Sequence, residues 1–116
     1  MIAVIFEVTP KKGMQGPYLD MAAQMKEHLE GFDGFVSVER FQSLTTPGKL
    51  LSLSIWRDEE SVQRWRKLTA HRGAQEMGRQ RFFADYSLRV ASVMRDYGMD
   101  ARQEAPADSR AHHGAM

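Results

Sequence analysis

Four short stretches of the chain are rich in branched and aromatic residues, a pattern typical of β-strands. Turn-forming residues separate these stretches, notably residues 10–13 after the first and 45–48 between the second and third. The pattern predicts strands over residues 2–9, 35–44, 49–57 and 86–95, with the middle two paired as an antiparallel hairpin.

Two stretches between the strands instead repeat apolar residues at three- and four-residue steps, which predicts helices. In the first helix, Gly31 fits the left-handed residue that commonly ends a helix. Asp58 is a good N-cap for the second helical region, which is expected to extend to about Phe83. We expect a break in this region near Leu68, where Thr69 would cap a second helical segment.

The predicted order of elements is β-α-β-β-α-β, the ferredoxin-like arrangement of an α+β domain. A four-stranded antiparallel sheet would carry both helices on one face. The 116 residues allow one domain, which we assign to residues 1–97. Residues 98–116 contain almost nothing to bury, so we expect a flexible C-terminal tail there.

Both faces of the predicted sheet contain apolar residues, although two helices can cover only one face. The expected opposite sets are Val4 and Phe6 against Ala3 and Ile5, Val36 and Val38 against Phe35 and Phe41, and Leu51, Leu53 and Ile55 against Leu50 and Trp56. A second copy packed sheet to sheet would cover the remaining face, which predicts a homodimer. The alternative is that a few apolar residues are simply exposed.

The charge balance argues against nucleic acid and anionic membranes as partners, because both require a concentrated positive field. The formal net charge is +1, with 42% hydrophobic and 27% charged residues. No cysteine is present, which excludes disulfides, thiolate metal sites and cysteine nucleophiles. The N-terminal apolar run lacks the basic start of a signal peptide, and no stretch reaches the length of a membrane span. These features predict a cytoplasmic location.

A more specific pattern lies in the second half of the chain. Residues 54–62 combine the end of a strand with an acid-rich helix start, and Trp65, His71 and a Phe-x-x-Tyr step from Phe83 to Tyr86 follow. With this pattern, residues 51–97 resemble the antibiotic-biosynthesis monooxygenase family. The resemblance implies a dimeric α/β barrel with a pocket between the sheet and the helices of each subunit. It also implies either cofactor-independent oxidation of polycyclic phenols or haem degradation, both of which occur in that family.

His71 is the first candidate for chemistry, because a neutral imidazole acts as a base near neutral pH or binds haem iron. The resemblance places it at the proximal histidine of the haem-degrading branch, and Ala74 on the same helical stripe leaves room for a flat ligand. Trp65 resembles a tryptophan that distorts the porphyrin in that branch. A surface or capping histidine and a core tryptophan are the alternatives.

Glu7 stands where the resembling haem-degrading members carry an asparagine, and an ionised carboxylate is a poor donor to bound oxygen. A partly buried Glu7 would instead act as a general base on a phenolic proton, unless it simply faces water at the strand end. Arg79 is expected to stabilise an anionic ligand, if it does not lie on a solvated helix face. Phe83 and Tyr86 are expected to form walls of the pocket.

Three functions are consistent with these residues. The leading hypothesis is a cofactor-independent oxygenase that acts on a small aromatic or quinol-like substrate, with no metal and with His71 or Glu7 as base. The second is a haem-binding or haem-degrading monooxygenase, in which His71 binds the iron. The third is a non-catalytic dimeric module that binds a small molecule.

Overall fold

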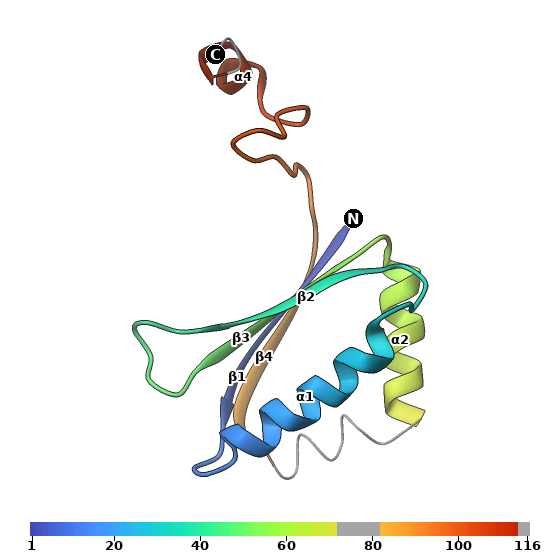
Figure 1. Cartoon of the computed structure of the whole chain (residues 1–116), viewed down its shortest axis with the longest axis vertical. Helices are drawn as coiled ribbons and strands as arrows, with labels where there is room; N and C mark the ends of the chain where they lie inside the picture. The colour runs from blue at the N-terminus through green and yellow to red at the C-terminus, as the bar shows by residue number, and fades with distance from the viewer. Residues whose placement is uncertain (72–81, 114–116) are drawn as a thin grey trace.

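Within the described residues, four strands form one antiparallel sheet with the order β2-β3-β1-β4 (Figure 1). The computed structural model describes residues 1–71 and 82–113, and at 70–71 and 111–113 the backbone alone. The strands are β1 (Ile2–Pro10), β2 (Phe35–Gln42), β3 (Leu50–Trp56) and β4 (Phe83–Ser92). The helices are α1 (Gln15–Leu29), α2 (Glu59–His71) and α4 (Ala107–His113). This order confirms the predicted ferredoxin-like fold.

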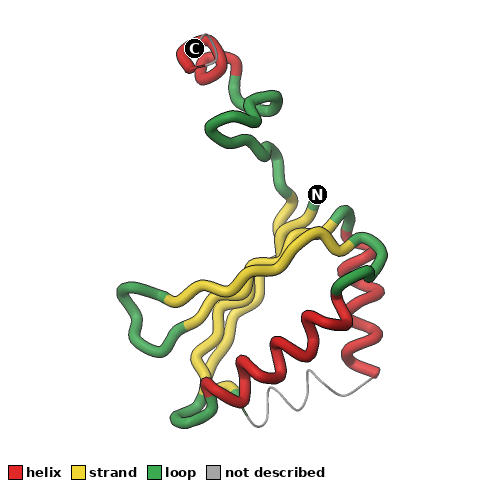
Figure 2. The backbone as a smooth tube through the Cα atoms, viewed as in Figure 1, coloured by secondary structure: helices red, strands yellow, loops and turns green. Residues whose placement is uncertain are grey.

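Helices α1 and α2 lie on the same side of the sheet, as predicted (Figure 2). The antiparallel register shows which strand residues point towards them. Val4 and Phe6 of β1 pair with Ser54 and Ser52 of β3, and all four belong to this helix face. The residues between them point to the opposite side, which we call the open face: Ala3, Ile5, Glu7, Ser37, Glu39, Phe41, Leu51, Leu53, Ile55, Ser87, Arg89 and Ala91.

The prediction for strand β2 was wrong at its beginning. Phe35 pairs with Trp56, and its ring lies 5.5 Å from the indole of Trp56 on the helix face. The register shifts between Phe35 and Ser37, so Val36 is the extra residue of a β-bulge and is 56% exposed. Because the bulge resets the alternation, Phe35 shares a face with Val38 and not with Phe41.

The packed part of the core lies where α1 crosses the sheet. Val8, Tyr18 and Leu50 are buried there, with Val8 only 1% exposed. Phe6, Met21, Phe82 and Phe83 pack around these three residues. This cluster fixes one end of α1 against β1 and β3.

The ends of the helices follow local rules that the sequence shows. Gly31 has φ +82° directly after the C-cap of α1, as predicted. Asp58 caps α2, since its Oδ1 accepts a hydrogen bond of 2.8 Å from the backbone N–H of Ser61. The break at Leu68 was wrongly predicted: α2 continues through it, and the Thr69 hydroxyl donates back to the carbonyls of Trp65 and Arg66.

Strand β4 begins at Phe83, three residues before the predicted start, because Phe83 pairs with Pro10. After Ser92 the chain leaves the sheet and ends in α4 (Figure 1). In this C-terminal segment Ala105 is 4% exposed, and Arg102 donates a 2.6 Å hydrogen bond to the Ser109 hydroxyl. The flexibility predicted for residues 98–116 stays a prediction. In the part of the chain that is described, no helix is long and apolar enough to cross a membrane.

Candidate functional site

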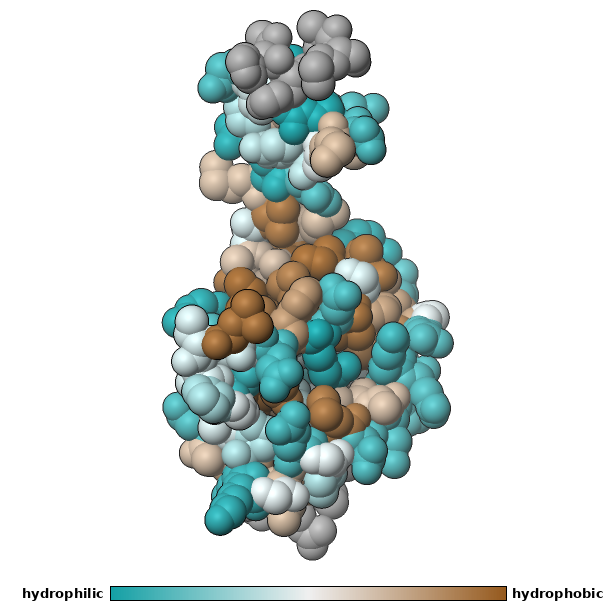
Figure 3. All heavy atoms as spheres, turned by 60° about the vertical axis from the view of Figure 1, so that its left-hand side comes forward, coloured by the Kyte–Doolittle hydropathy of each residue, from teal (hydrophilic) through white to brown (hydrophobic). Residues whose placement is uncertain are grey.

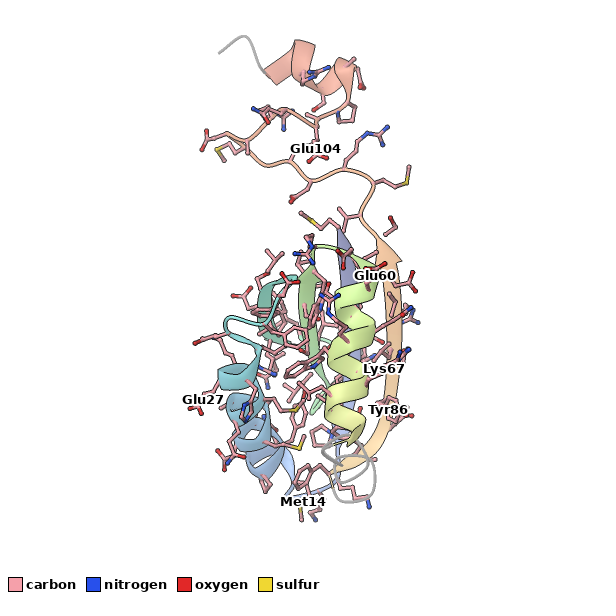
Figure 4. All side chains as sticks on the ribbon, turned by 90° about the vertical axis from the view of Figure 1, so that its right-hand side faces the viewer. Met14, Glu27, Glu60, Lys67, Tyr86 and Glu104 are labelled. Atoms are coloured by element: carbon pink, nitrogen blue, oxygen red, sulfur yellow. The ribbon has the colours of Figure 1, made fainter. Side chains whose placement is uncertain are left out.

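A cavity of about 460 Å³ lies between the helix face of the sheet and helices α1 and α2. This volume lies in the range of sites that hold small organic molecules. Its walls are mostly apolar, and six aromatic side chains border it: Phe6, Tyr18, Trp56, Trp65, Phe83 and Tyr86. Figure 4 views this side of the molecule, with α1 and α2 in front of the sheet and Tyr86 on the edge strand β4.

The aromatic side chains form two groups. Phe6, Phe83 and Tyr86 contact one another with ring centroids 5.5–5.9 Å apart, and Tyr18 lies edge-on to Phe83 at 5.5 Å. Trp56 and Trp65 form the second group, 6.4 Å apart. Phe32 lies edge-on to Trp65, with ring centroids 5.3 Å apart, and restrains the position of that indole. The cavity therefore offers rigid aromatic surfaces on both β4 and α2.

The polar groups of the cavity come mainly from β2 and β3. Ser54 accepts a 2.9 Å hydrogen bond from the indole N–H of Trp56, which fixes that ring. Arg40 of β2 lines the cavity, and its guanidinium group lies near the phenol of Tyr18. Burial raises the pKa of Tyr18 above its usual value, and the nearby Arg40 opposes this rise. Tyr18 is therefore a protonated phenol at neutral pH.

Three of the residues singled out in the sequence come together at this cavity. Trp65, Phe83 and Tyr86 all line it, although they come from α2 and β4. Strand β4 pairs antiparallel with β1, and this pairing places Tyr86 opposite Val8. Their roles in binding or chemistry stay predictions.

Glu7 lies elsewhere. It belongs to the open face, and its Oε2 lies 3.4 Å from the Lys49 ammonium and 3.5 Å from Nη1 of Arg89. The sheet separates this carboxylate from Trp65 and Tyr86, so the structure does not bring Glu7 together with the cavity residues.

The remaining candidates lie at or beyond the end of α2. His71 is the last residue of that helix, and its side chain is outside the described residues. Ala74 and Arg79 also lie outside them. Haem binding through His71 therefore stays a prediction. In the described ranges, no group of three or more histidine or acidic residues is placed to hold a metal ion.

Sequence reasoning missed the polar part of the cavity, namely Arg40, Ser52 and Ser54. Arginine and serine on a strand most often face solvent, so the sequence alone does not indicate that these three residues line a cavity. The available signal was alternation, because Arg40 is two residues after Val38 and therefore shares its face.

Comparison with known proteins places this fold in a family. The family model for antibiotic biosynthesis monooxygenases matches residues 1–77. A protein of Pyricularia oryzae named jasmonate monooxygenase ABM is 46% identical over 93 residues, which cover 80% of this chain and 43% of that protein. The chain thus spans less than half the length of that relative.

Two further comparisons extend the likeness. The uncharacterized protein YqjZ of Bacillus subtilis is 31% identical over 93 residues, covering 80% of this chain and 79% of that protein. The crystal structure of SnoaB, a cofactor-independent oxygenase from Streptomyces nogalater, superimposes with a TM-score of 0.69 at 10% identity. That match covers 82% of this chain and 94% of SnoaB, and it shows a shared fold. By its family model and its relatives, the chain belongs to the antibiotic biosynthesis monooxygenase family.

Proposed function

We propose that this chain is a cofactor-independent monooxygenase that oxidises a small aromatic or quinol-like molecule inside the cavity. The main support is the cavity itself, which has a volume of about 460 Å³ and six aromatic side chains in its wall. Such a site suits a flat ring system. Family membership, the name of the Pyricularia oryzae relative and the oxygenase activity named for the structural neighbour SnoaB agree with an oxygenase.

The proposed reaction uses the substrate as its own electron donor. A base removes a proton from a CH₂ carbon within the ring system, and the resulting carbanion passes one electron to dioxygen. The two radicals join through a new C–O bond, and protonation gives a hydroperoxide. Loss of water from this hydroperoxide leaves a carbonyl group. One oxygen atom stays in the product and the other leaves as water, so no further reductant is required.

His71 remains the proposed base in this scheme. It ends α2, the helix from which Val62, Trp65 and Arg66 line the cavity. We do not propose Glu7 for this step, because it lies on the open face beside Lys49 and Arg89. If His71 is the base, His71→Ala should lower turnover by about 10²–10⁴-fold, the usual contribution of a positioned general base.

The direct test is oxygen consumption by the purified chain with a panel of anthrone-type quinols and with jasmonate. We expect ¹⁸O₂ to place one labelled atom in the product, detected by mass spectrometry. Ala22→Phe should lower kcat/KM by about 10- to 100-fold, because it fills the cavity and displaces the substrate. Ala23→Phe is the matched control, since the neighbouring Ala23 is exposed on α1. No oxygen consumption with any probe would contradict the proposal.

We also propose that the open face packs against a second copy of the chain. Ile5, Leu51, Leu53 and Ile55 form an apolar group on this face, and no described helix covers it. Figure 3 views the molecule from this side, where hydrophobic side chains gather below the C-terminal segment among hydrophilic ones. Sheet-to-sheet packing is the common way to bury such a surface.

A further inference from the structure

Arg40 puts a positive charge into the wall of a cavity that is otherwise largely apolar. In the register of the sheet, Arg40 lies opposite Ser52, and Ser52 lies opposite Phe6. All three residues line the cavity. The guanidinium group therefore belongs to the same surface as the aromatic group around Phe6.

One donor of this guanidinium has no partner among the described residues. The Nε atom of Arg40 is buried and makes no hydrogen bond there, although the guanidinium group lies near the phenol of Tyr18. Tyr18 is only 4% exposed. Because buried donors of charged groups are normally paired, the unpaired Nε–H shows that the described wall does not satisfy this guanidinium group.

The charges around Arg40 are not balanced by the described wall. None of the ion pairs between described residues involves Arg40. Among the described residues that line the cavity there is a second arginine, Arg66, and no aspartate or glutamate. Arg66 is exposed, so its charge is better solvated than that of the half-buried Arg40. An anion is the ligand that this imbalance favours.

We propose that Arg40, together with Tyr18, binds the carboxylate of an organic acid whose ring system occupies the aromatic part of the cavity. The two terminal Nη groups of a guanidinium are spaced to bind both oxygens of a carboxylate. The phenol of Tyr18 lies near Arg40 and has an O–H to donate to the same ligand. Raising of the Tyr18 pKa by burial keeps that proton in place at neutral pH.

This assignment deepens the proposed function and rests on it, since it names the class of substrate that the same cavity takes. It predicts that a substrate carries an acid group at one end and the oxidised ring at the other. The apolar walls would then hold the ring, and Arg40 would fix its direction in the cavity.

A matched pair of probes tests this directly: 1-naphthaleneacetate and its neutral analogue 1-naphthaleneacetamide, each titrated by calorimetry into the full chain. Wild type should bind the acid more tightly than the amide. Arg40→Leu should weaken binding of the acid by about 10- to 100-fold, as expected for loss of a charge-assisted bidentate bond. Binding of the amide should change by less than about threefold.

Further variants test whether a loss of acid binding comes from the anion site itself, from misfolding or from a change in overall charge. Arg40→Lys keeps the charge but loses the planar fork, so it should give an intermediate loss and serves if Arg40→Leu does not fold. Lys67→Leu, at an exposed cation of α2 that does not line the cavity, is the matched control and should leave the preference for the acid intact. Tyr18→Phe should weaken the acid alone, by about 3- to 10-fold.

Equal binding of both probes to wild type, no binding of either, or an acid preference that survives Arg40→Leu would each overturn the carboxylate site. The proposed function fails on a different result, namely no oxygen consumption by a chain that still binds the acid selectively. Oxidation of neutral quinols without any acid preference would leave the oxygenase and remove the carboxylate site.

Discussion

On strand β3, the residues that point towards the helices are Leu50, Ser52, Ser54 and Trp56, whereas Leu51, Leu53 and Ile55 point to the open face. In a sheet with one wet face, apolar residues lie under the helices and polar ones face water. Leu50 and Trp56 at the ends of β3 follow this rule, but the middle of the strand has serines on the covered side and apolar residues on the uncovered side.

This difference between the two sides of β3 indicates that the helix face and the open face of the sheet have different roles. The helices close against the sheet at the cluster of Val8, Tyr18 and Leu50, and elsewhere they enclose a cavity into which the two serines project. Helix-covered surface here serves ligand binding as well as packing. The apolar row of β3 on the other side has no described helix above it, which is why we assign that face to a second copy of the chain.

The largest expected effect comes from a charge placed on the open face. Leu53→Lys should convert a dimer into a monomer, because each copy would bury an unpaired ammonium at a cost of about 3–5 kcal/mol. Sedimentation velocity at micromolar concentration measures the change. Ala23→Lys on the exposed side of α1 is the control and should leave the dimer intact. A wild type that is monomeric at every concentration would refute the assignment of this face.

A smaller effect is expected where the helix layer is held beside the sheet. Gly34 has φ +91°, and a Cβ added there would collide with Cβ and Oγ of Ser61 in α2. Gly34→Ala should therefore lower the free energy of unfolding by about 3 kcal/mol, through backbone strain and overpacking.

Gly31 supplies the matched control for that change. It also has a left-handed backbone, with φ +82°, but an added Cβ meets nothing within 4 Å. Gly31→Ala should cost only about 1 kcal/mol, the strain of the backbone alone. Chemical denaturation measures both variants. Equal losses would mean that contact with Ser61 does not set the position of α2.

The fold could be predicted because alternation and helical spacing reflect the same burial that the structure shows. Val4 and Phe6 on one side and Ala3 and Ile5 on the other were assigned correctly from their spacing alone. The bulge at Val36 could not be predicted this way, because one extra residue reverses all assignments on one side of it and leaves no signal in composition.

The candidate site was predictable only in part, because its apolar members belong to recognisable patterns and its polar members do not. Trp65, Phe83 and Tyr86 belong to the pattern on which the predicted resemblance rests, and they line the cavity. The alternation of β1 places Glu7 on the same face as Ala3 and Ile5, away from Phe6. This pattern alone argues against Glu7 as a base inside the cavity. Arg40 went unnoticed because a single strand arginine most often faces water.

The smallest expected effect concerns Asp58, the N-cap residue of α2. A hydrogen bond from Arg57, and then those from Ser61, hold the pKa of Asp58 well below its ordinary value of 3.8. Since the pKa is lowered on folding, the ionised Asp58 stabilises the fold above about pH 4 and loses this effect as the pH falls further. Asp58→Asn keeps a cap acceptor but not the charge.

The difference in Tm between wild type and Asp58→Asn should therefore be small, largest near pH 7, and should shrink towards pH 2. Asp58→Ala separates the two contributions, because it removes the cap as well and should lie below Asp58→Asn at neutral pH. Thermal unfolding followed by circular dichroism gives all three curves. A difference that does not change with pH would show that Asp58 acts as a cap alone. Arg57 and Asp33, joined by a 2.9 Å ion pair, would then position α2 without help from the charge of Asp58.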